Sequence, residues 1–145
     1  MNPFNPSRAE VRSFFIESWK KTRDSGPATP LETLAGEWVR EHPEYHKLLS
    51  GDSEDVAGFN AGEGEANPFL HLSMHLSISE QVSIDQPPGI RAAAARLEAR
   101  LGSLHDAQHA MMECLGETLW TAQRNSSEPD GSAYLECIER RASQR

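Results

Sequence analysis

Long hydrophobic runs are absent from this sequence. Its longest uninterrupted apolar stretches, at residues 14–16 and 92–95, contain only three and four residues, whereas a membrane-spanning helix needs about 20. Residues 1–6 also lack the charged segment followed by an apolar stretch that is typical of a signal peptide. We therefore expect no membrane association and no secretion, which together predict a cytoplasmic protein.

Positive charge is scarce as well. The 145 residues include 14 Lys and Arg against 22 Asp and Glu, which gives a formal net charge of -8 at pH 7. Nucleic-acid-binding proteins present a basic face to the phosphates, so we expect no nucleic-acid partner. The basic residues near the start (Arg8, Arg12, Lys20, Lys21, Arg23) are better explained as a solvated helix face.

The motifs of several enzyme classes are missing. There are two cysteines, Cys114 and Cys137, which make neither a disulfide framework nor a metal-ligand pair. No phosphate-binding loop, dinucleotide fingerprint or marked nucleophile is present. Hydrophobic residues make up 37% and charged residues 25% of the chain, a composition that supports a modest core in one domain spanning residues 1–145.

Helix-start signals are frequent by contrast. Ser7 with Glu10 and Thr29 with Glu32 both form capping boxes. Further starts are indicated at Asn67, after residues 87–89, and at Asp130. The apolar spacing between these signals is helical, so we predict an all-α fold. It is a small helical bundle of about five helices, with the bundle formed near 7–24, 30–41, 68–85 and 103–124 and a last segment near 131–143.

Three segments need separate interpretation. Apolar residues keep a helical period from Ile90 to Ala122, and Gly102 predicts a kink or break within it. Residues 70–79 alternate strictly between apolar and polar, which is typical of a strand. The Asn-Pro start and the absence of a partner strand favour a helix buried nearly all round. Residues 50–66 hold five acids, four glycines and no base, and predict an acidic, Gly-rich loop.

The six histidines form the strongest functional signal. They fall into three pairs with i, i+4 spacing, namely His42 with His46, His71 with His75, and His105 with His109. On a helix this spacing places two imidazoles on one face about 6 Å apart, close enough to share an ion. The first pair is the weakest, because Pro43 moves His42 away from helical geometry.

The other two pairs are placed where a metal site would need them. His71 and His75 share a face with apolar residues, and His105 and His109 lie beside the apolar stripe of their helix, next to Glu113. We predict that these four histidines converge on one ion, with Glu113 and His46 as further ligands. Asp106, three residues before His109, has a spacing seen in carboxylate-bridged metal bundles, but an acid there also suits a helix start.

Two functions remain open from these residues. The first is a protein that binds a transition metal, zinc or iron above others, with a metalloenzyme as one form of it. The second is a non-catalytic helical interaction protein whose histidines are structural, with a protein partner or a second copy of the chain bound to it. The sequence does not identify a reaction, a substrate or an oligomeric state.

Several long stretches resemble a known bacterial family. They are residues 42–46 (HPEYH), 67–76 (NPFLHLSMHL), 80–91 (EQVSIDQPPGIR), 105–115 (HDAQHAMMECL) and 118–120 (TLW). The chain resembles the proteobacterial family catalogued as domain of unknown function 1841 over nearly its whole length. The resemblance implies a small protein of about this size and no assigned activity, so it supplies no catalytic residues. The metal site is inferred from spacing alone.

Overall fold

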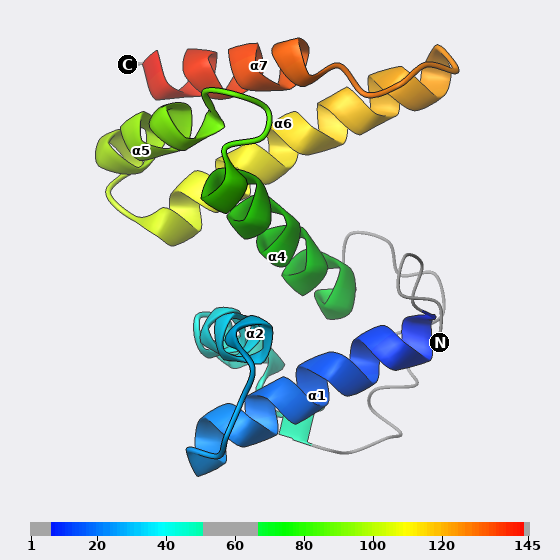
Figure 1. Cartoon of the computed structure of the whole chain (residues 1–145), viewed down its shortest axis with the longest axis vertical. Helices are drawn as coiled ribbons and strands as arrows, with labels where there is room; N and C mark the ends of the chain where they lie inside the picture. Colours follow the sequence, from blue (N-terminus) through cyan, green and yellow to red (C-terminus); the bar gives the residue numbers. More distant parts are fainter. Residues whose placement is uncertain (1–6, 51–66, 144–145) are drawn as a thin grey trace. The chain divides into compact units, whose positions relative to one another are not determined.

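The computed structural model describes residues 7–50 and 67–143 (Figure 1). Within these ranges the chain forms six α-helices, two short 3-10 helices and no strand. The all-α prediction is confirmed. The elements are α1 (Arg8–Asp24), α2 (Pro30–Arg40), η1 (Pro43–Tyr45), η2 (Leu48–Ser50), α4 (Pro68–Ile84), α5 (Ile90–Leu101), α6 (Leu104–Arg124) and α7 (Gly131–Ser143). The acidic loop predicted at 50–66 lies almost wholly outside the described residues.

The helices begin where the capping signals predict. Both capping boxes form, at Ser7 with Glu10 and at Thr29 with Glu32. The side-chain oxygen of Asn67 accepts from the backbone of Phe69 at 2.9 Å, and that of Asp130 caps α7 in the same way. Each of these oxygens satisfies donors that the first turn of a helix leaves without partners.

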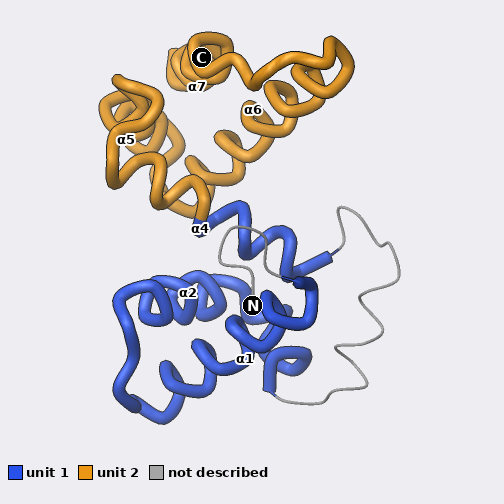
Figure 2. Tube along the Cα trace, turned by 45° about the vertical axis from the view of Figure 1, so that its right-hand side comes forward, with its two compact units in different colours: residues 1–76 blue, residues 77–145 orange. Residues whose placement is uncertain are grey.

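The chain divides into two compact units, Met1–Leu76 and Ser77–Arg145, which Figure 2 colours separately. The boundary falls inside α4, so this helix contributes its first half to unit 1 and its second half to unit 2. Each unit is described by itself below. The prediction of one domain over residues 1–145 stays a prediction.

Unit 1 is built on the pairing of α1 with α2. At Gly36 of α2 a Cβ atom would lie 1.8 Å from Oγ1 of Thr22 on α1, so the two helices approach closely only because this residue is glycine. Lys21 and Glu32 join the same two helices by an ion pair of 2.7 Å. The core contains nine buried apolar residues: Phe15, Trp19, Ala35, Trp38, Val39, Leu48, Leu49, Phe69 and Leu72.

Unit 2 packs α5, α6 and α7 with the end of α4. Its core is formed mainly of aliphatic and small side chains, with Ile78, Ile90, Leu97 and Ile138 fully buried. α5 ends at Leu101, Gly102 takes a left-handed conformation with φ +88°, and Ser103 caps α6. The predicted interruption at Gly102 is therefore a full break between two helices.

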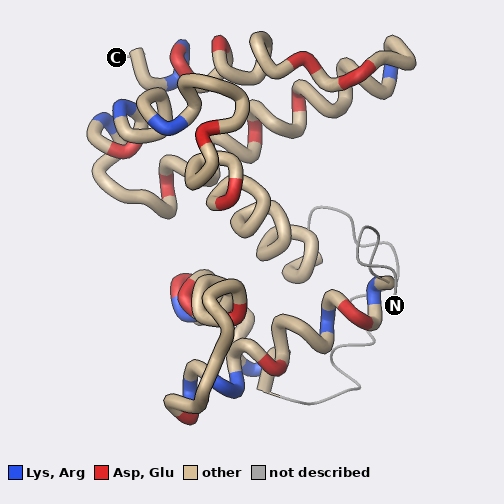
Figure 3. Tube along the Cα trace, viewed as in Figure 1, with Lys and Arg blue, Asp and Glu red and all other residues tan. Residues whose placement is uncertain are grey.

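The ambiguous segment is helical. α4 runs without interruption through residues 68–84, which confirms the helix and excludes the strand. Acidic and basic residues are nearly absent from it, since Glu80 is its one Asp, Glu, Lys or Arg, and Figure 3 shows its tube almost entirely tan. Burial nearly all round is not observed, because Leu70 and Ile84 keep 49% and 57% of their surface exposed.

A disulfide in unit 2 corrects the interpretation of the cysteines. Cys114 of α6 and Cys137 of α7 are bonded, with their Cα atoms 5.7 Å apart. A separation of 23 residues shows no motif in the sequence, and the two side chains meet only because α6 and α7 pack against each other. None of the helices in the described ranges is long and apolar enough to span a bilayer.

Candidate metal centre

His42 lies where α2 ends. Pro43 begins the next helical turn, and His42 has φ -124° and ψ 71°, outside the helical region as Pro43 predicts. Its backbone N–H bonds the carbonyl of Val39, and its ring Nδ1 donates to the carbonyl of Trp38 at 2.6 Å. A carbonyl only accepts, so Nδ1 carries the hydrogen. In the neutral ring of His42, Nε2 therefore carries a lone pair and accepts hydrogen bonds.

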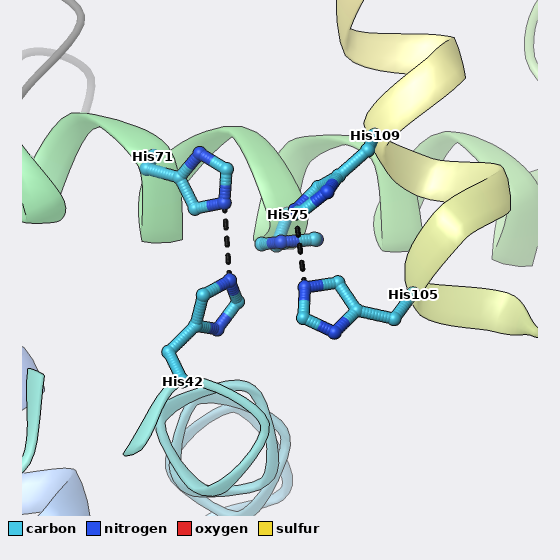
Figure 4. A group of neighbouring side chains, drawn as sticks. All are labelled: His42, His71, His75, His105 and His109. Carbon is cyan, nitrogen blue, oxygen red and sulfur yellow. Dashed lines mark hydrogen bonds between the residues drawn. The ribbon is translucent and has the colours of Figure 1, made fainter. Parts of the chain in front are cut away.

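His71, in the second turn of α4, faces this lone pair. Its Nε2 lies 3.0 Å from Nε2 of His42 (Figure 4). Because His42 already uses its one N–H on Trp38, His71 is the donor of this bond. The contact brings one imidazole nitrogen from the segment after α2 and one from α4 close to each other. Their distance of 3.0 Å is near the separation that two ligands of one tetrahedral zinc keep, about 3.3 Å for a Zn–N distance of about 2.0–2.1 Å.

His75 completes a cluster of three. Its side chain is fully buried and stacks on the indole of Trp38, with centroids 3.8 Å apart and an interplanar angle of 13°. The ring centroid of His75 lies 4.9 Å from that of His42 and 4.8 Å from that of His71. One ring nitrogen of each histidine lies within 4.8 Å of the others. We call His42, His71 and His75 the histidine triad.

Tyr45 forms a wall of the triad. Its ring lies parallel to that of His42, with centroids 5.1 Å apart and an interplanar angle of 2°. Burial, with a smaller contribution from the carboxylate of Glu44, raises the pKa of Tyr45. Trp38 thus packs on the ring of His75 and Tyr45 on the ring of His42, which limits the rotation of both imidazoles.

His46 has a different environment from its partner in the pair. Its ring stacks on Trp19 with centroids 4.4 Å apart, and Nε2 donates to the carbonyl of Val39 at 2.8 Å. The carbonyls that His42 and His46 bond belong to the last turn of α2, where the helix itself supplies too few donors. The structure thus gives Nε2 of His46, a predicted ligand, a backbone partner.

His105 and His109 form their own pair in unit 2. Their Nε2 atoms are 3.0 Å apart and their ring centroids 4.3 Å apart, as the i, i+4 spacing predicts (Figure 4). Both lie in the first turns of α6, which starts at the Ser103 cap. Asp106 lies in that first turn, where the helix dipole favours an acid. The prediction that this pair shares an ion with His71 and His75 stays a prediction.

Glu113 was predicted as a further ligand one helical turn after His109. Its carboxylate forms an ion pair of 2.7 Å with Arg141 of α7 and keeps 62% of its side-chain surface exposed. This contact stays within unit 2 and gives Glu113 a structural partner between two helices.

Sequence reasoning missed His42 as a site residue. Pro43 correctly predicts its non-helical backbone, but that departure is what turns the ring toward α4. The signal in the sequence is its position four residues after Trp38 at a helix end, where a histidine can bond a terminal carbonyl. The same bond makes Nε2 the lone-pair nitrogen of the neutral ring and supplies the outer-shell partner that metal-bound histidines usually have.

Comparison with known proteins identifies a family. No curated protein and no solved structure matches the chain. The family model described as domain of unknown function (DUF1841) matches residues 7–140, nearly the whole sequence. The chain belongs to this family, as its motifs suggested.

Proposed function

We propose that this protein binds a transition-metal ion through the histidine triad. The observation that carries the proposal is the convergence of three imidazoles, that of His42 after the end of α2 and two from α4, with a hydrogen of His42 kept on Nδ1 by Trp38. To bind an ion, His71 moves its hydrogen from Nε2 to Nδ1 and presents Nε2 as a second lone pair. The ring nitrogens then need to move by roughly 1.5 Å at most to reach tetrahedral ligand spacing.

Neutral nitrogen donors set the class of metal. Imidazole suits zinc, iron, copper and nickel, whereas magnesium and calcium prefer oxygen ligands. We propose zinc or iron, as the sequence suggests. An ion held by the triad alone would keep a coordination position open, which is the arrangement that catalytic zinc sites use to activate water. A metalloenzyme is therefore one form of the proposal, without a substrate assigned.

The experiment is elemental analysis of tag-free protein purified without chelator, followed by zinc titration in a calorimeter. The test variant is His71→Gln, whose amide can still donate to Nε2 of His42 but is a poor metal ligand. We expect about one ion per chain in the unmodified protein and at least tenfold weaker binding in the variant. A ratio well below one, with no effect of added zinc, iron or copper on melting temperature, overturns the proposal.

His46→Gln is the matched control. It removes an imidazole from the same unit but keeps a donor for the carbonyl of Val39, which His46 bonds in the structure. We expect unchanged metal affinity. Loss of affinity in this variant would show that His46 is a ligand, as the sequence predicts.

The alternative function is a helical interaction protein with structural histidines. His46 is an example of a structural histidine, because it bonds the carbonyl of Val39. Leu119 and Trp120 of α6 expose 46% and 59% of their surface, which suits contact with a partner. This alternative predicts that His71→Gln lowers stability equally with and without added metal. The partner, a protein of another kind or a second copy of the chain, is not specified by these residues.

The cytoplasmic location predicted from the sequence stays a proposal. The disulfide between Cys114 and Cys137 weighs against it, because cytosolic thiols are usually kept reduced. Titration of free thiols in protein extracted under acid quench tests this directly: two free thiols per chain support a cytosolic location.

A further inference from the structure

The charge of the ligands at the histidine triad determines what else an ion there would bind. All three donors are imidazoles, and the carbonyl of Trp38 keeps a hydrogen of His42 on Nδ1. Among the described residues, the group of ligand atoms that converges there includes no carboxylate and no thiolate. A divalent ion bound by neutral donors keeps its full charge of +2. Further histidine ligands would not change this balance, since they are neutral as well.

The surroundings make that charge costly. His42 and His75 keep 2% and 0% of their surface exposed, and aromatic rings of Tyr45 and Trp38 cover them. An uncompensated charge in such an environment is strongly unfavourable. Glu44 is near enough to raise the pKa of Tyr45, but its side chain is exposed and outside the ligand group.

We infer that the metal-loaded triad binds a small anion as its additional ligand. This inference rests on the proposed metal binding. His71 is only partly buried, so the cluster has an edge that solvent reaches. The anion supplies the compensating charge as a further ligand of the ion. The chemical class is a compact monoanion with one donor atom, because the rings of Trp38 and Tyr45 pack against two of the three imidazoles and limit the space beside them.

The experiment uses the full chain loaded with Co²⁺, whose visible absorption bands report on ligands, and azide as the anion probe. We expect a saturable band shift with azide and none with perchlorate at equal ionic strength. One bound Co²⁺ per chain with bands that azide does not change overturns the inference and leaves the metal proposal intact. Failure to bind Co²⁺, zinc or iron overturns the metal proposal itself.

A charge variant sharpens the test. His71→Glu keeps a ligand on the same turn of α4 but supplies a negative charge, so we expect metal retention and at least tenfold weaker azide binding. Ser77→Glu is the matched control, because it adds the same charge to an exposed position of the same helix. Equal azide affinity in His71→Glu and the control contradicts the inference. If His71→Glu does not fold, the azide and perchlorate titrations of the unmodified chain still decide.

Discussion

Units 1 and 2 bury polar side chains in different ways. In unit 2, Gln108 bonds Ser79 at 3.0 Å and Thr118 bonds the carbonyl of Cys114 at 2.9 Å, so each has a neutral protein partner. In unit 1 the buried polar groups include His42 and His75, which lie against a third imidazole. A neutral imidazole offers one N–H and one lone pair, so clustered rings compete for donors. An ion that accepts several lone pairs would resolve that competition.

The two units also differ in how their helices are joined. A disulfide links α6 to α7 in unit 2, whereas the described part of unit 1 relies on aromatic packing, a glycine contact and one ion pair. Unit 1 therefore stands to gain more from a bound ligand. Four predictions test this comparison, from the largest expected effect to the smallest.

Replacement of a tryptophan in each unit gives the largest contrast. Trp38 is 4% exposed and supports His75 by stacking, so Trp38→Ala is expected to cost about 3–5 kcal/mol of unfolding free energy and to abolish metal binding. Trp120 is 59% exposed and has the guanidinium of Arg124 over its ring, so Trp120→Ala should cost less than about 1 kcal/mol. Urea unfolding followed by circular dichroism measures both. Equal losses would contradict the comparison.

Removal of the disulfide should destabilise unit 2 selectively. For a loop of 23 residues the chain-entropy model gives about 3 kcal/mol, which the double variant Cys114→Ala and Cys137→Ala should lose. Thermal unfolding with and without a reductant measures it: the reductant should lower the melting temperature of the unmodified chain to that of the variant. A melting temperature that the reductant leaves unchanged would show that the covalent link adds nothing to packing.

Metal should stabilise the chain only through its histidines. At a free metal concentration a hundred times the dissociation constant, the unfolding free energy should rise by about 2.7 kcal/mol, and His71→Gln should remove the gain. The double variant His105→Gln and His109→Gln tests the predicted sharing of one ion. We expect one ion per chain before and after this change, with weaker binding after it. A fall from two ions to one would show two separate sites.

Low pH should reduce the stability of each unit through protonation of one carboxylate, Glu32 in unit 1 and Asp85 in unit 2. Lys21, and then the backbone of Thr29, lower the pKa of Glu32 in unit 1, and the backbone N–H groups of Arg91 and Gly89 lower the pKa of Asp85 in unit 2. A lowered pKa stabilises the fold at pH above the ordinary values of 4.5 and 3.8. This stabilisation is lost as the pH falls through the lowered values.

Single variants separate the two carboxylates. Glu32→Gln and Asp85→Asn should each flatten the acid dependence of the melting temperature over this range, which scans between pH 2 and 6 would record. High salt should reduce the contribution of Glu32 more than that of Asp85, because the Lys21 ion pair is screened. Identical salt dependence in the two variants would contradict this assignment.

The sequence by itself determined the helices and most of their ends. Capping oxygens at Ser7, Thr29, Asn67 and Asp130 act over three residues, so their effect is local and readable. The Asn-Pro start of α4 correctly predicted a helix, although apolar and polar residues alternate along it as in a strand. The pairing of His105 with His109 is likewise a property of helical spacing.

Tertiary packing decided the parts of the site that join distant residues. The disulfide depends on how α6 lies on α7, and the triad depends on how the end of α2 meets α4. His42 lies in the site because Pro43 ends the helical geometry there and the carbonyl of Trp38 bonds its Nδ1. His46, four residues later, instead bonds the carbonyl of Val39 and stacks on the ring of Trp19. The spacing of residues in the sequence predicts which side chains share a helix face. Their hydrogen-bond partners depend on which segments pack against that face, and some of these segments are distant in the sequence.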